Sequence, residues 1–159
     1  MTVFDMDYMK PMPVVFEIGY RYLPSATGPS TNRPEPLVMF HTPMPGRIRV
    51  TDRNRADLDW SNNNLTWRHR NRIRAERRVT THHYHSGPYA SAEFFYQSQY
   101  SKWSSTRLYV GCLLPLSKLN RHLELDPYYE HENNADQRPN QQLNIGGFII
   151  SLYFPPNKP

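Results

Sequence analysis

The chain lacks three features that would identify common classes of protein. Cys112 is its single cysteine, which excludes an intramolecular disulfide and a zinc site built on cysteines. No stretch approaches the roughly 18 consecutive apolar residues that a membrane-spanning helix needs. Helical periodicity is almost absent as well. A disulfide-stabilised scaffold and a helical membrane protein are therefore both excluded.

The beginning of the chain also lacks a secretory signal. Residues 1–10 contain neither a basic segment nor the apolar segment that follows it in a signal peptide. An exported protein needs such a leader. Either the true start lies upstream, with further strands, or the protein is cytosolic.

What the sequence does contain favours β-structure. Hydrophobic residues make up 38% of the 159 residues and aromatic residues 13%. This combination suits alternating strands, which place an apolar residue only at every second position. The length allows one domain. We expect a disordered or truncated N-terminus over residues 1–12, a β-domain over 13–154 and a proline-rich tail over 155–159.

Eight segments with a period of two are separated by turn-forming residues. They are residues 13–23, 37–42, 47–60, 65–80, 89–100, 106–116, 122–132 and 141–154. The stretches 24–36, 81–87 and 133–140 are expected as loops, and Pro43 to Gly46 and Ser61 to Asn64 as tight turns. The predicted fold is an all-β, antiparallel up-and-down meander of about eight strands, either an outer-membrane-type barrel or the C-terminal part of a larger one.

The alternation gives each strand two different faces. The apolar faces of two strands are predicted to contact lipid, through Leu108, Val110, Leu114, Phe148, Ile150, Leu152 and Phe154. A soluble sandwich would show the same periodicity with its apolar faces inward. Segment length favours the barrel, because a tilted membrane crossing takes about 9 to 11 residues and soluble strands average about 5 to 6.

The strongest signal is a run of alternating arginines in residues 47–78. Two arginine-lined strands joined as a hairpin would repel each other unless carboxylates from other strands lie among them. We therefore expect a polar lumen filled by a network of opposite charges. Its predicted members are Arg53, Arg55, Arg68, Arg70, Arg72, Arg74, Glu76, Glu93, Glu124, Asp126 and Glu130. The alternative is a solvated face with ordinary surface ion pairs.

Five segments and the chain end resemble a known family. They are Asp52 to Leu58, Trp67 to Arg72, Pro88 to Tyr96, Thr106 to Gly111, Asp126 to Asn134 and the Leu152-Tyr153-Phe154 ending. Together they resemble the bacterial family called domain of unknown function 2490, over residues 18–154. The resemblance implies a β-barrel in the bacterial outer membrane, with outer-membrane lipids and the barrel assembly machinery as partners, and it supplies no catalytic residue. The absent leader and the tail Pro155 to Pro159 depart from the family pattern.

Two other functions remain open. A net charge of +5 and interleaved aromatics would suit a soluble nucleic-acid-binding domain, although the arginines have carboxylates placed to match them. A lipid-modifying barrel enzyme would need serine and histidine near the membrane rim, and nothing in the sequence arranges them. We therefore predict a non-enzymatic protein that does not bind nucleic acid, and the sequence identifies no small-molecule ligand.

A cluster of histidines is the single candidate for a metal site. His82, His83 and His85 lie within four residues, and imidazoles in such a cluster can bind a transition metal. Most loop histidines bind nothing, and no cysteine or acidic cluster adjoins these. We therefore predict neither a metal site nor a cofactor.

Overall fold

The computed structural model of the chain contains one antiparallel sheet and describes residues 13–81, 84–116, 123–135 and 139–153. Its strands are β1 (Val14–Leu23), β2 (Thr31–Met44), β3 (Ile48–Ser61), β4 (Asn64–Arg77), β5 (Val79–Thr81), β6 (Tyr84–Gln97), β7 (Lys102–Pro115), β8 (Leu123–Asn134) and β9 (Gln141–Leu152). The order across the sheet is β1-β2-β3-β4-β6-β7-β8-β9, with the short β5 paired to β6. The predicted all-β, antiparallel meander is confirmed.

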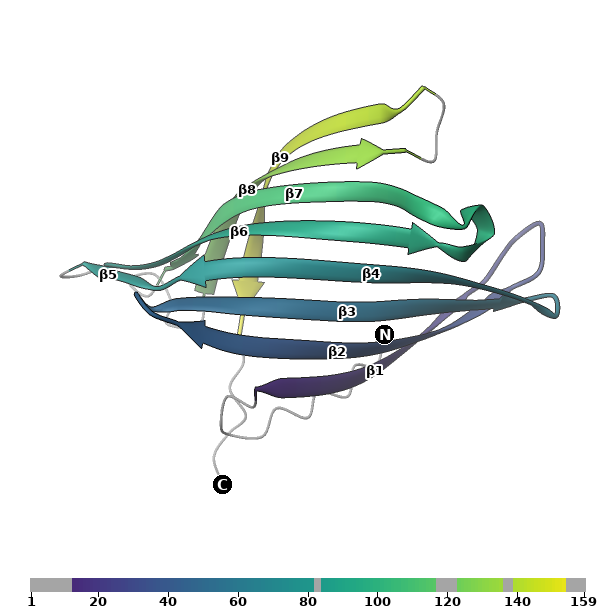
Figure 1. The fold of residues 1–159 in the computed structure, drawn as a ribbon, viewed down its shortest axis with the longest axis horizontal. Coiled ribbons are helices and arrows are strands. Elements are labelled where there is room, and N and C mark those ends of the chain that lie inside the picture. Colours follow the sequence, from purple (N-terminus) through teal and green to yellow (C-terminus); the bar gives the residue numbers. More distant parts are fainter. Residues whose placement is uncertain (1–12, 82–83, 117–122, 136–138, 154–159) are drawn as a thin grey trace.

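The sheet is twisted and curved, and its described strands do not close into a barrel. Figure 1 shows β1 to β4 along one side, with β8 and β9 on the other side. The strands β1 and β9 form the two edges. A single 3₁₀ turn, η1 (Ser98–Tyr100), lies between β6 and β7. In the described part of the chain, no helix is long and apolar enough to span a membrane.

Two hairpin turns follow directly from the local sequence. Asn62 and Asn63 join β3 to β4 with φ angles of 49° and 58°, the pair of positive values that a two-residue hairpin turn requires and that asparagine tolerates. Gly46 (φ 79°) and Arg47 (φ 62°) turn the chain between β2 and β3. Both turns were predicted, although Pro43 and Met44 belong to β2.

The predicted loop over residues 24–36 is wrong in its second half, because β2 begins at Thr31. Its prolines, Pro34 and Pro36, pair with Tyr20 and Ile18 of β1. On the other side, the pairing of β2 with β3 is interrupted between Asn32 and Leu37 and then resumes in the same register. Proline has no backbone N–H group to donate. Because alternate residues of a strand direct their N–H groups to the same neighbouring strand, Pro34 and Pro36 both lack a hydrogen bond on the same side of β2. The backbone hydrogen bonds on the other side of β2 are unaffected and keep the strand in the sheet.

The predicted loop over residues 81–87 is also too long. β6 begins at Tyr84. β5 pairs Val79 with Ser86 of β6, and this pairing has the same register as the pairing of Arg68 in β4 with Gln97 in β6. β5 therefore continues β4, as the single predicted segment 65–80 implied. β7 likewise begins at Lys102 rather than Thr106, and the register shifts at Phe95/Tyr96.

The buried part of the molecule is polar. Apart from Gly87, nine of the described residues are buried; seven of them carry polar or charged side chains, and Leu37 and Phe95 are the two apolar ones. We call the side of the sheet that carries Glu35, Asp57 and Glu93 the inner face, and the opposite side the outer face. The curvature of the sheet encloses the inner face, since side chains from β2 to β4 and from β8 and β9 line one shared cavity.

Candidate functional site

The inner face carries equal numbers of arginines and carboxylates. Its arginines are Arg21, Arg33, Arg49, Arg53, Arg55, Arg68, Arg70, Arg72, Arg74 and Arg107. Its carboxylates are Glu17, Glu35, Asp57, Asp59, Glu76, Glu93, Glu124, Asp126, Glu130 and Glu132. The two sets are equal in size, and Lys102, which pairs with Gln97 at the end of β7, adds one positive charge. The inner face of the described residues is therefore close to neutral at pH 7 when its carboxylates are ionised.

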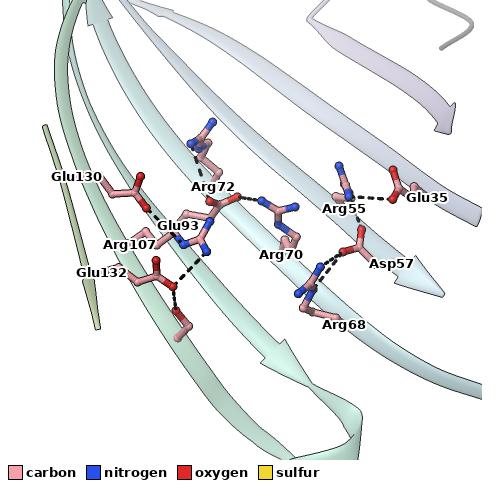
Figure 2. Close-up of polar contacts among 11 residues, drawn as sticks. Glu35, Arg55, Asp57, Arg68, Arg70, Arg72, Glu93, Arg107, Glu130 and Glu132 are labelled. Atoms are coloured by element: carbon pink, nitrogen blue, oxygen red, sulfur yellow. Dashed lines mark hydrogen bonds and ion pairs between the residues drawn. The ribbon is translucent and has the colours of Figure 1, made fainter. Parts of the chain in front are cut away.

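Asp57 of β3 is fully buried, with a side-chain exposure of 0%. One carboxylate oxygen accepts a hydrogen bond from Arg55, and the other accepts from Arg68 on β4, with 2.7 Å to its terminal nitrogen. Arg55 also contacts Glu35 of β2 at 3.1 Å. Figure 2 shows the resulting chain of charges across three adjacent strands. Such a buried carboxylate is stable only because its partners compensate for lost hydration.

Two further sets of ion pairs join β4 to β6 and β7 to β8 (Figure 2). Glu93 of β6 contacts Arg70 at 3.0 Å and Arg72 at 3.9 Å. Arg107 of β7 contacts Glu130 at 3.5 Å and Glu132 at 3.1 Å. Since direct cross-strand pairing opposes Arg55 to Arg70 and Arg53 to Arg72, the carboxylates of neighbouring strands offset the repulsion within the β3–β4 hairpin.

Aromatic rings on the inner face lie against the guanidinium groups. Phe95 of β6 has the guanidinium carbons of Arg70 and Arg107 at 4.9 and 4.8 Å from its ring centroid. Arg72 lies 4.7 Å from the Tyr109 ring and Arg74 lies 3.7 Å from the Tyr89 ring. These distances are within the range of cation–π attraction. The rings therefore hold the arginine side chains in place where ion pairs alone would leave them freedom.

Tyrosine hydroxyls provide hydrogen bonds to two carboxylates of β8. Tyr89 donates to Asp126 at 3.0 Å, and Tyr153 donates to Glu124 at 3.1 Å. Burial and the hydrogen bond to Glu124 raise the pKa of Tyr153. At neutral pH, each of these two tyrosines is therefore a hydrogen-bond donor.

Two glycines make room for tyrosine rings on the inner face. A Cβ on Gly111 of β7 would lie 2.6 Å from the ring of Tyr89, its direct cross-strand neighbour. A Cβ on Gly147 of β9 would lie 2.9 Å from the ring of Tyr128, again its direct neighbour. In both pairs, a tyrosine covers the glycine across the strand. Glycine at these positions sets where the tyrosine hydroxyl can reach.

The structure brings together most of the charged residues that the sequence predicted. Ion pairs involve Arg55, Arg68, Arg70, Arg72, Arg74, Glu76, Glu93 and Glu130. Arg53 has no ion pair with the described residues. Glu124 and Asp126 accept hydrogen bonds from Tyr153 and Tyr89. The prediction of site residues omitted Glu35, Asp57, Arg107 and Glu132. Asp57, Arg107 and Glu132 follow the same alternation and could have been included, whereas Glu35 lay in a predicted loop.

The outer face exposes large apolar side chains. Phe16, Ile18 and Phe148 are 73%, 71% and 69% exposed. The predicted lipid-facing residues Leu108, Val110, Leu114, Phe148, Ile150 and Leu152 all lie on this side, and Phe154 lies outside the described residues. Near the ends of their strands, outer-face aromatics gather: Trp67 stacks on Tyr96 with 5.4 Å between centroids, and Tyr96 meets Trp103 edge-on at 5.6 Å.

A polar cluster interrupts the apolar outer face between β3 and β4. Asp52 accepts hydrogen bonds from Asn54 at 3.1 Å and from Asn71 at 2.7 Å. Asn71 also donates to Asn54 at 2.9 Å. The carboxylate and the two amides thus provide hydrogen bonds for one another. This cluster was not predicted.

The histidine cluster is only partly described. His82 and His83 lie outside the described residues, and Nδ1 of His85 lies 3.3 Å from the Thr80 hydroxyl. Elsewhere in residues 13–153 as far as they are described, no group of three histidine, cysteine or acidic side chains is arranged to hold a metal ion.

The fold and the inner face together define the class of protein: one curved antiparallel meander whose buried side is charged and whose exposed side is apolar. A family model described as "Protein of unknown function (DUF2490)" matches residues 12–143, and the chain belongs to this family. No curated protein and no solved structure matches the chain.

Proposed function

We propose that the chain is a non-enzymatic β-barrel protein of the bacterial outer membrane, with lipid against its outer face and a polar lumen filled by the charged residues of its inner face. The observation that carries this proposal is the inverted distribution of side chains. Asp57 is fully buried while Phe16 is 73% exposed. Water makes both placements costly, whereas lipid outside a closed barrel favours them.

The strand lengths and the outer aromatics give further support. Seven strands of 12 to 14 residues (β2, β3, β4, β6, β7, β8 and β9) are long enough to cross the hydrocarbon layer when tilted. The cluster of Trp67, Tyr96 and Trp103 lies near one end of the sheet, as do the aromatic side chains at membrane–water interfaces. The proposal also requires partners for the edges β1 and β9, because lipid cannot hydrogen-bond to an open edge.

The matched charges of the inner face do not favour nucleic-acid binding. A nucleic-acid interface is a basic surface without compensating carboxylates. Here Arg55, Arg68 and Arg70 each contact a carboxylate of the same chain. Among the residues that the structure describes, no serine hydroxyl is hydrogen-bonded to a histidine ring.

Refolding of the full chain in detergent micelles tests the proposal. We expect a β-rich circular dichroism spectrum and faster migration on a gel for the unheated sample than for the boiled one, because a closed barrel resists unfolding by the gel detergent. A chain that folds to a β-rich, soluble monomer without detergent would contradict the membrane assignment. Salt-dependent binding to DNA would then be measured next.

A further inference from the structure

Two adjoining, partly open cavities on the inner face are lined by side chains of β4, β8 and β9, among other strands. The larger has a volume of about 430 Å³ and the smaller about 300 Å³. Both are lined by Arg72, Arg74, Asp126 and Ile149. Together they offer space for a small polar molecule.

Apart from Glu76 of β4, which also lines the larger cavity, the charges that line these cavities are separated by sign. Arg49, Arg53, Arg72 and Arg74 of β3 and β4 form what we call the basic wall, and Glu124, Asp126 and Glu130 of β8 form the acidic wall. Within the part of the chain that the structure describes, no ion pair joins the two walls. Arg49 and Arg74 contact Glu76 on their own side, and Glu130 contacts Arg107.

Several of these groups are incompletely satisfied by the protein. Arg53 has no ion pair with the described residues, and its Nε is buried without a hydrogen bond. Asp126 accepts a hydrogen bond from Tyr89 at Oδ2, while its Oδ1 is buried and has no hydrogen-bond partner among the described residues. Buried charged groups are costly in this condition. A guest with both a negative and a positive group would compensate the two walls at once.

We propose that the cavities bind a small zwitterionic solute, with its acid group toward Arg53, Arg72 and Arg74 and its amine toward Asp126 and Glu124. This inference rests on the proposed function, because the site lies inside the barrel. An anion alone would face the acidic wall and a cation alone the basic wall, so neither compensates both. The stacking of Arg72 on Tyr109 and of Arg74 on Tyr89 fixes two guanidinium groups before any ligand arrives.

The test uses 4-aminobutyrate with two matched probes, butyrate and butylammonium, each carrying one of its two charges. Binding is measured by equilibrium dialysis against the full chain refolded in micelles. The gel assay must first show that the unheated sample migrates faster than the boiled one, which we call barrel mobility. We expect 4-aminobutyrate to bind at least about tenfold more tightly than either probe, since each lost charge-assisted hydrogen bond is worth about that factor or more.

Variants of the two walls locate the site. Arg53→Met and Asp126→Asn should each weaken 4-aminobutyrate binding about tenfold. Arg21→Gln, an inner-face arginine that contacts Glu35 and does not line either cavity, should leave binding unchanged. If Asp126→Asn fails to fold, Glu124→Gln replaces it as the variant of the acidic wall, because Glu124 makes no ion pair with the described residues.

Three outcomes would overturn the inference. Barrel mobility without binding of 4-aminobutyrate would mean that water fills the cavities. Equal binding of butyrate would indicate an anion site, and unchanged binding by both wall variants would place the ligand elsewhere. Failure of the wild-type chain to show barrel mobility would instead contradict the proposed function, and the inference with it.

Discussion

At the scale of single residues, Asp57 is the most buried charged side chain in the described part of the molecule. It is fully buried and accepts hydrogen bonds from Arg55 and Arg68. Asp57→Asn removes the negative charge and leaves two guanidinium groups facing a neutral amide. We expect the free energy of unfolding to fall by about 3 kcal/mol or more, measured by urea titration of the refolded protein.

Asp59 provides the control for this substitution. It lies on the same strand and face, pairs with Arg33, and is partly exposed at 26%. Asp59→Asn should cost about 1 kcal/mol or less, because water screens the pair. An equal loss in both variants would show that burial of Asp57 does not determine its contribution.

Gly111 is a second residue whose side chain, or lack of one, matters. Its added Cβ would lie 2.6 Å from the Tyr89 ring, so Gly111→Ala must displace a tyrosine that contacts Arg74 and Asp126. We expect a loss of about 1 to 3 kcal/mol in the free energy of unfolding, the usual cost of overpacking.

Gly146 is the matched control, since nothing lies within 4 Å of its added Cβ. Gly146→Ala should leave stability unchanged or raise it by about 0.5 kcal/mol, through reduced freedom of the unfolded chain. If Gly111→Ala were as harmless as Gly146→Ala, the tyrosine would not depend on the space that Gly111 leaves.

At the scale of elements, ion pairs connect neighbouring strands across the inner face. Arg70 of β4 and Glu93 of β6 are 3.0 Å apart. Arg70→Glu and Glu93→Arg should each destabilise the fold, because each places like charges together. The double variant should recover about 1 kcal/mol or more relative to the sum of the single losses, measured by the same urea titration. Strictly additive losses would show that this pair does not couple the two strands.

At the scale of the whole molecule, the outer face distinguishes a barrel in lipid from a soluble sheet. Leu108 lies in the middle of β7 and Leu65 at the start of β4, with nearly equal exposures of 50% and 49%. In water, lysine at either exposed position would change the free energy of unfolding by no more than about 0.5 kcal/mol. In a bilayer, we expect Leu108→Lys to cost about 2 to 4 kcal/mol and Leu65→Lys about 1 kcal/mol or less, because the cost depends on depth.

Folding into lipid vesicles followed by urea titration measures this difference. The two variants share the same chemistry and nearly the same exposure, and they differ in their position along the strands. Equal and small losses for Leu108→Lys and Leu65→Lys would contradict the assignment of the outer face to lipid.

The sequence alone determined the strand count closely and the content of the two faces. Alternation with a period of two depends only on neighbouring positions, so it predicted that Arg68 and Arg70 share a side opposite Trp67. The turn at Asn62 and Asn63 is likewise a local property, because asparagine tolerates positive φ. Local rules failed for Pro34 and Pro36, whose place in β2 depends on a ladder to β1 that lies more than ten residues away.

Only the tertiary structure decided which charges meet. Arg70 contacts Glu93 rather than Glu124, and Asp126 contacts Tyr89 rather than an arginine, because cross-strand register and sheet curvature set these distances. The cavities between the basic and acidic walls have the same origin, because the curvature of the sheet brings β3 and β4 opposite β8 and β9. The sequence thus determined which face each charge lies on, through a period set by the backbone. Its partners were decided by pairing and curvature, which join residues far apart in the chain.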